Sequence, residues 1–313
     1  MITARYLETG KQNSRKPREV GIRKWEVGSN FPLPISDFRL PISLFPLFLL
    51  LLFSSCSTTL AQPAPVDSFR LLYTLPLEAQ WFTVDKLQQV YLITGQNEVV
   101  KYRPDGREQF RYNNNTRGEL AYIDATDPFN LLLFYPELQG IATLDRTMNE
   151  TGWLLLFSAQ IINATAVALA PDNNIWVYDQ AAFQLRKIGR DGAQLTTTDN
   201  LSAQLGRPPF ARQAIARENM VYLYDPGQGV FIFDNFGQFH QLLDLSGFTQ
   251  LQVLDGNLLL FQPGAALAYN LERFQSAALR LPDTGGQARQ AYWQARRLYL
   301  LNEKGMVEVY ERR

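Results

Sequence analysis

A short apolar run recurs six times along the chain at intervals of about 40 residues, and no other feature limits the possible folds as strongly. The runs are spaced by 41, 44, 46, 37 and 40 residues and begin at Val90, Leu131, Ile175, Val221, Leu258 and Leu298. A repeat of this length is typical of propeller blades, each of which is a four-stranded antiparallel sheet. The sequence therefore predicts an all-β fold, a six-bladed β-propeller.

The segments around each copy support this prediction. Every copy is preceded by a shorter apolar run, such as "WFTVD" at Trp81 or "QAYWQ" at Gln290, and is followed by a third run. Three of the third runs end in Asp-Gly or Phe-Gly turns, which supply the positive φ that a tight hairpin into a fourth run requires. The alternative is an irregular β-sandwich with coincidental spacing, which the constant order of the four parts disfavours.

The two ends of the repeat region predict how the ring closes. The last copy has three runs, and the chain then ends at Arg313. The missing strand is available as "FRLLYTLPL", which begins at Phe69. Pairing of residues 67–77 with residues 306–312 would complete the last blade and leave no open edge in the ring.

Three of the copies carry a resemblance to a known family. The stretches "VYLITGQNEVVKYRPDGR", "IWVYDQAAFQLRKIGRDGA" and "VYLYDPGQGVFIFDNFGQ" resemble the NHL-type repeats of six-bladed propellers, within the NHL-repeat-like and TolB-like superfamily. The second, fifth and sixth copies depart from the pattern and match it mainly by position. The resemblance implies the fold for residues 67–313, but it implies no single activity because this superfamily includes enzymes, receptors and scaffolds.

The N-terminal region resembles the signal of a bacterial lipoprotein. The apolar run "LFPLFLLLLF" ends at Phe53 and has about half the length of a membrane-spanning helix, roughly 20 residues. Two serines separate it from Cys56, which we expect to be lipid-modified. We expect residues 1–55 to be a signal region that is disordered or removed, with its start placed too early, and residues 56–66 to be a tether. An ordinary signal peptide with an incidental cysteine is the alternative.

The same resemblance predicts a location. The residue after Cys56 is Ser57 rather than aspartate, which by resemblance to Gram-negative lipoproteins favours the outer membrane. No acidic cluster follows, so we expect the protein to face the periplasm. A membrane partner is therefore expected only through the lipid anchor at Cys56, since stable anchoring requires more than one acyl chain and a triacylated cysteine provides them.

Composition excludes several classes of function. Cys56 is the only cysteine and His240 the only histidine, so internal disulfides and multi-histidine metal sites are excluded. From Cys56 onward there are 22 basic and 26 acidic residues. Nucleic-acid binding requires a basic surface, so we expect no nucleic-acid partner.

Candidate binding residues lie in the predicted turns between second and third strands, because propellers bind ligands at the face that carries these turns and the connections entering each blade. Amide side chains there donate and accept hydrogen bonds without acid–base chemistry, and Tyr135 and Phe183 are the expected aromatic anchors for a protein or peptide partner. The alternative interpretation is that polar residues simply populate turns. The candidates are Gln96, Asn97, Tyr135, Glu137, Gln139, Asp179, Phe183, Gln184, Asp225 and Gln228.

The leading hypothesis is a non-catalytic envelope lipoprotein without a cofactor. The alternative is a metal-dependent lactonase or hydrolase with a calcium ion at the channel mouth, for which Asn97, Glu98 and Asp225 are possible ligands. No nucleophile elbow, P-loop or zinc motif is present in the sequence.

Overall fold

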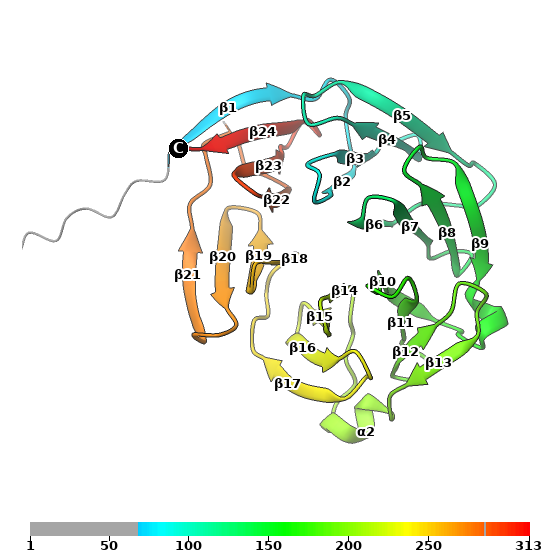
Figure 1. Ribbon diagram of the computed structural model, residues 1–313. Coiled ribbons are helices and arrows are strands. Elements are labelled where there is room, and N and C mark those ends of the chain that lie inside the picture. Colours follow the sequence, from blue (N-terminus) through cyan, green and yellow to red (C-terminus); the bar gives the residue numbers. More distant parts are fainter. Residues whose placement is uncertain (1–67, 285) are drawn as a thin grey trace, which may run out of the picture. The chain divides into compact units, whose positions relative to one another are not determined.

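The computed structural model describes residues 68–284 and 286–313, which form six four-stranded antiparallel sheets arranged in a ring (Figure 1). The signal region 1–55, Cys56 and the tether 56–66 lie outside the described residues. The predicted fold, a six-bladed β-propeller, is confirmed.

Blades 1 to 3 follow one another along the chain. Blade 1 comprises β2 (Trp81–Val84), β3 (Val90–Ile93), β4 (Glu98–Tyr102) and β5 (Glu108–Asn113). Blade 2 comprises β6 (Tyr122–Asp127), β7 (Asn130–Tyr135), β8 (Gly140–Asp145) and β9 (Glu150–Leu155), followed by the short 3-10 helix η2 (Leu156–Ala159). Blade 3 comprises β10 (Ala164–Leu169), β11 (Ile175–Asp179), β12 (Gln184–Ile188) and β13 (Gln194–Thr197).

Blades 4 to 6 complete the ring after the helix α2 (Leu201–Leu205). Blade 4 comprises β14 (Gln213–Arg217), β15 (Met220–Asp225), β16 (Gly229–Asp234) and β17 (Phe239–Leu243). Blade 5 comprises β18 (Gln250–Leu254), β19 (Asn257–Gln262), β20 (Ala265–Asn270) and β21 (Gln275–Leu279). Blade 6 comprises β22 (Gln290–Gln294), β23 (Arg297–Leu301), β24 (Val307–Arg312) and β1 (Phe69–Thr74).

Each of the six recurring apolar runs is the second strand of a blade, and the run before it is the first strand, next to the axis (Figure 1). The second strands are buried along almost their whole length, as in β3 and β11, because a neighbouring blade covers each face. Outermost strands such as β21 are mostly exposed. The near-continuous apolar runs thus reflect burial on two faces rather than one.

The N-terminal strand closes the last blade as predicted. β1 pairs antiparallel with β24, and the register runs from Phe69 opposite Arg312 to Thr74 opposite Glu308. The hydrogen bond from the amide of Leu75 to the carbonyl of Val307 extends the pairing by one residue. The first and last described segments therefore belong to one sheet, and the ring has no unpaired seam.

The hydrophobic core of the described residues is divided into six clusters, one between each pair of neighbouring blades. The cluster between blades 6 and 1, for example, brings Tyr299 and Val309 against Phe82 and Leu92. The cluster between blades 3 and 4 includes Trp176 and Phe231. Each blade is therefore stabilised mainly by its neighbours, and no blade has a core of its own.

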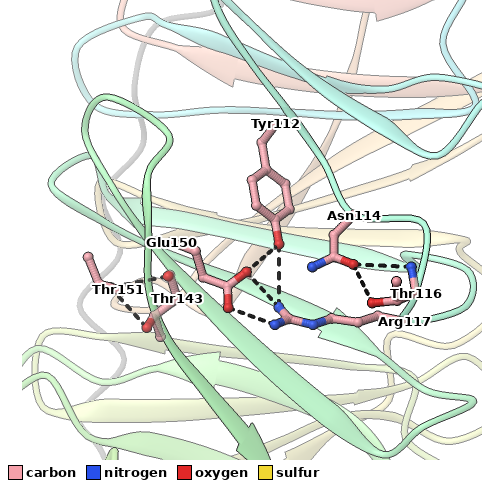
Figure 2. Close-up of polar contacts among 7 residues, drawn as sticks. All are labelled: Tyr112, Asn114, Thr116, Arg117, Thr143, Glu150 and Thr151. Carbon is pink, nitrogen blue, oxygen red and sulfur yellow. Dashed lines mark hydrogen bonds and ion pairs between the residues drawn. The ribbon is translucent and has the colours of Figure 1, made fainter.

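Polar contacts also join blades at the rim. Figure 2 shows Tyr112 of β5, Arg117 of the connection to blade 2, and Glu150 of β9 pointing toward one another. The Arg117 guanidinium makes two hydrogen bonds to the Glu150 carboxylate, at 2.7 and 2.8 Å, and lies 3.9 Å from the centre of the Trp153 ring. The hydrogen bonds from Arg117 hold the pKa of Glu150 below its usual value, despite the opposing effect of partial burial. We call Tyr112, Arg117 and Glu150 the rim latch.

Candidate functional site

The axis of the propeller contains a cavity of about 610 Å³ that is lined by residues from all six blades. Each first strand runs antiparallel to the second, so the turns between second and third strands lie at the same end of the blade as the connection that enters it. We call this end the entry face. The sequence-based expectation that binding groups would be found there thus points to one mouth of the cavity.

Six equivalent positions surround this mouth, one immediately before each first strand. All six line the cavity, and none is acidic: Gln80, Ala121, Asn163, Arg212, Thr249 and Arg289. Amide and hydroxyl groups can donate and accept hydrogen bonds, and the two guanidinium groups carry permanent positive charge. The mouth is therefore polar and basic.

Glutamine side chains inside the cavity join the first strands of neighbouring blades. The amide of Gln290 accepts a hydrogen bond from the Phe82 N–H at 3.0 Å and donates one to the Phe82 carbonyl at 2.7 Å. Gln213 forms the same pair of bonds with Leu251, and Gln252 forms it with Trp293. These side-chain amides pair with backbone N–H and carbonyl groups at the channel-facing edge of the neighbouring first strand. They therefore stabilise the wall of the channel and are not free to bind a ligand.

Asp124 carries the only carboxylate among the described residues that line this cavity, and it too is committed to the wall. It accepts hydrogen bonds from the backbone N–H groups of Thr126 and Leu169, each at 2.8 Å. Burial raises its pKa, opposed by these hydrogen bonds and by the charge of Arg217. The Leu169 bond links blade 2 to blade 3, which indicates a structural role.

Most of the polar residues predicted to bind a partner are used to build the entry face. Both amide atoms of Asn97 bond to the backbone of the connection into blade 2, at Gly118 and Leu120. Gln139 exchanges two hydrogen bonds with the backbone of Ala164, where blade 3 begins. The structure thus uses these side chains as links between neighbouring blades.

The remaining polar candidates of blades 3 and 4 have similar partners. Asp179 and Asp225 are buried and accept hydrogen bonds from the N–H groups of Asn163 and Phe210 respectively. The side chain of Gln228 donates to the Pro208 carbonyl, and that of Gln184 donates to the Thr198 carbonyl. Gln96 and Glu137 are exposed in the turns of blades 1 and 2.

The expectation that Tyr135 is an exposed anchor is wrong. Tyr135 is the last residue of β7 rather than a turn residue, and only 1% of its surface is accessible. Its ring packs edge-on against Trp153 at a centroid distance of 5.7 Å. Phe183 is half-buried, and its φ of 51° places it in the left-handed backbone conformation of the β11–β12 turn.

The three proposed metal ligands do not converge. Asn97 and Glu98 belong to blade 1, where the Glu98 carboxylate pairs with Arg111, whereas Asp225 belongs to blade 4. Within residues 68–284 and 286–313, no three histidine, cysteine, aspartate or glutamate side chains are placed to hold a metal ion. His240 lies on the outermost strand of blade 4, 3.7 Å from Asp234.

Exposed apolar side chains gather on the entry face between blades 2 and 3. The loops that carry them are joined, because the N–H of Leu156 donates to the Gln139 carbonyl and the N–H of Ile161 donates to the Leu156 carbonyl. The side chains next to these bonded residues point outward, with Phe157 76% and Ile162 67% exposed. We define the apolar patch as Leu138, Leu155, Phe157 and Ile162. Gln139 and Asn163, which follow two of its members in sequence, line the cavity, so the patch adjoins the mouth.

No protein-family model matches the chain, and no curated protein matches it. The fold is nevertheless shared with many solved structures. The WD40 domain of Pan2 from Neurospora crassa superposes with a TM-score of 0.54 at 9% identity, covering 78% of this chain and 95% of that one. Virginiamycin B lyase from Staphylococcus aureus, in an inactive form solved with quinupristin, gives 0.53 at 11% identity, covering 78% and 89%.

PorZ, described as an essential surface component of the type-IX secretion system of Porphyromonas gingivalis, gives a TM-score of 0.50 at 14% identity, covering 71% of this chain and 29% of that one. At such low identities these similarities show the propeller fold alone, since unrelated functions share it. The NHL-type resemblance remains a prediction. Within the described residues, no helix is long and apolar enough to cross a membrane.

Proposed function

We propose that this protein is a non-catalytic lipoprotein of a Gram-negative cell envelope, anchored at the outer membrane through Cys56, and that its entry face binds a protein or peptide partner. The observation that carries the binding function is the apolar patch beside the open channel mouth. Four exposed apolar side chains on loops that are joined by backbone hydrogen bonds are characteristic of a protein interaction site.

The opposite face provides a contrast. Its exposed apolar residues Leu87, Phe129, Phe236 and Phe274 stand singly, each in a different turn of a different blade. Scattered apolar residues of this kind are normal on soluble proteins and require no partner. The entry face alone combines grouped apolar side chains with a polar cavity.

The chemistry of the channel favours binding over catalysis. Asp124 and three of the glutamines that line it, Gln213, Gln252 and Gln290, are paired with backbone groups of neighbouring first strands. A general acid or base must have a free lone pair or proton in reach of the substrate. Polar groups that are hydrogen-bonded to the backbone of the channel wall are poorly suited to act as a general acid or base.

The experiment that tests the proposal compares two phenylalanines with the same exposure, 76%, on opposite faces. The full chain is expressed with an affinity tag, extracted gently in detergent, and its co-purified envelope proteins are compared for Phe157→Ser and Phe236→Ser. We expect Phe157→Ser to lose a partner that the wild type and Phe236→Ser retain. Equal recovery with all three proteins would reject the entry face as the binding surface.

The anchor is tested separately by Cys56→Ala. The wild type is expected in the membrane fraction and the variant in the soluble fraction, because Cys56 is the only cysteine of the sequence and so carries the only thiol that can form a thioether bond to a lipid. A variant that still sediments with membranes would refute anchoring through Cys56.

A further inference from the structure

The sequence Ala-Arg-Gln-Ala occurs twice, at residues 211–214 and 288–291, and both copies occupy the same place in the fold. Each begins in the connection entering a blade and ends in the first strand, β14 in one case and β22 in the other. The first alanine of each copy is buried, and the glutamine clamps the first strand of the next blade. The repeat therefore places Arg212 and Arg289 at equivalent positions on the channel mouth.

Backbone hydrogen bonds fix the main chain at both arginines. The N–H of Arg212 donates to the Tyr224 carbonyl at 2.9 Å, and the N–H of Arg289 donates to the Leu301 carbonyl at 2.7 Å. Rigid neighbours on both sides reduce the conformational entropy that these positions would lose on binding a ligand.

The two guanidinium groups have no ionic partner within the described residues. Both side chains are exposed and line the cavity, and neither makes a hydrogen bond or an ion pair there. By contrast, Arg111, Arg117 and Arg186 each pair with a carboxylate. Asp124, the cavity's carboxylate, is taken up by backbone N–H groups. Positive charge at the mouth of a partly enclosed channel attracts and concentrates anions.

We infer that the channel mouth binds the carboxylate groups of an acidic segment of the partner, with Arg212 and Arg289 as the recognising residues and the side-chain amide of Asn163 as a neighbouring hydrogen-bond donor. This inference rests on the proposed function. A guanidinium presents paired N–H donors that match a carboxylate in geometry. The adjoining apolar patch favours a peptide over a small free anion, since it offers contact area beyond the charged groups.

The test uses unlabelled, N-acetylated peptides and measures their binding to the purified chain by isothermal titration calorimetry. Pentaglutamate with an amidated C-terminus presents side-chain carboxylates, pentaglutamine as the free acid presents a terminal carboxylate, and amidated pentaglutamine presents neither. We expect at least one carboxylate peptide to bind and the amidated pentaglutamine not to bind. The tighter of the first two peptides identifies the source of the carboxylate.

Arg212→Gln and Arg289→Gln should each weaken this binding about tenfold, which corresponds to ~1.4 kcal/mol. Arg273→Gln is the matched control, because Arg273 is an exposed arginine in the β20–β21 turn outside the cavity. Its affinity should stay within about twofold of the wild type. Equal weakening by Arg273→Gln, or no binding of either carboxylate peptide by the folded wild type, would overturn the inference.

Failure of this inference and failure of the proposed function are distinguishable. If Arg212→Gln/Arg289→Gln still captures the partner that Phe157→Ser loses, the entry face binds its partner without the arginines, and the inference alone is wrong. If Phe157→Ser and the wild type recover the same proteins, the proposed function fails whatever the peptides do.

Discussion

Replacing Gln290 by methionine tests whether side-chain amides in the channel hold neighbouring blades together. Gln290 is 6% exposed, and its amide makes two hydrogen bonds to the backbone of Phe82, across the joint between blades 6 and 1. Methionine has a similar length and no donor or acceptor of comparable strength. The substitution therefore leaves the N–H and the carbonyl of Phe82 without their partners.

The cost follows from these two groups. Each buried polar group left unsatisfied costs about 1–3 kcal/mol, so the free energy of unfolding should fall by about 2–6 kcal/mol. For a domain of this size, each kcal/mol lowers the melting temperature by about 2–4 °C, so we expect a loss of roughly 8–16 °C at the middle of that range. Because Gln213 makes the same pair of bonds with Leu251, Gln213→Met should cost a similar amount.

The assay is urea denaturation followed by tryptophan fluorescence, with calorimetry for the melting temperature. Gln287→Met is the control, because Gln287 is exposed and its side chain makes no hydrogen bond within the described residues. A Gln290→Met protein that melts within about 1 °C of this control would refute the reasoning, since channel water would then replace the amide at no cost.

Three further predictions concern closure, pH and metal. Ending the chain at Gly305 removes β24 and leaves β1 without a partner, so the cooperative thermal transition seen by circular dichroism should be lost for the whole propeller; a transition like that of the full chain would contradict ring closure. The pKa of Glu150 is lowered in the folded state, so the rim latch stabilises the fold above the unfolded pKa of about 4.3 and loses this contribution as pH falls through the lower folded value. Denaturation of Glu150→Gln should therefore show a shallower loss of stability on acidification than the wild type, and identical pH profiles would count against the latch. Calcium should shift the melting temperature by less than about 1 °C, since Asn97 and Asp225 already bond to backbone groups, and a clear rise would favour the metal-dependent alternative.

The sequence allowed the fold to be predicted because a propeller repeats one pattern under one constraint. Burial on two faces makes the second strand of every blade apolar, so the runs at Val90 and Leu298 could be recognised although little else in their blades is alike. The missing strand of the last copy and the spare strand at Phe69 predicted closure by simple complementarity. These signals depend on backbone pairing and burial, which a sequence records directly.

The site was harder to predict because the sequence does not distinguish a polar turn residue that binds a partner from one that bonds to the protein's own backbone. Asn97 and Gln139 were expected to bind a partner, yet Asn97 bonds to the connection that enters blade 2, and Gln139 bonds to Ala164, the first residue of blade 3. Tyr135 was expected in the turn after the second strand, but it is the last residue of that strand and is buried against Trp153. The repeated Ala-Arg-Gln-Ala was visible in the sequence. Its link to the channel mouth could be recognised only from the structure, in which both copies lead into the first strand of a blade.

Photo-crosslinking in intact cells tests most directly whether the entry face is the binding surface. A photoreactive phenylalanine analogue placed at position 157 should yield a discrete crosslinked product with an envelope protein. The same analogue at position 236, equally exposed on the opposite face, should yield none. A product at 236 and none at 157 would contradict the account.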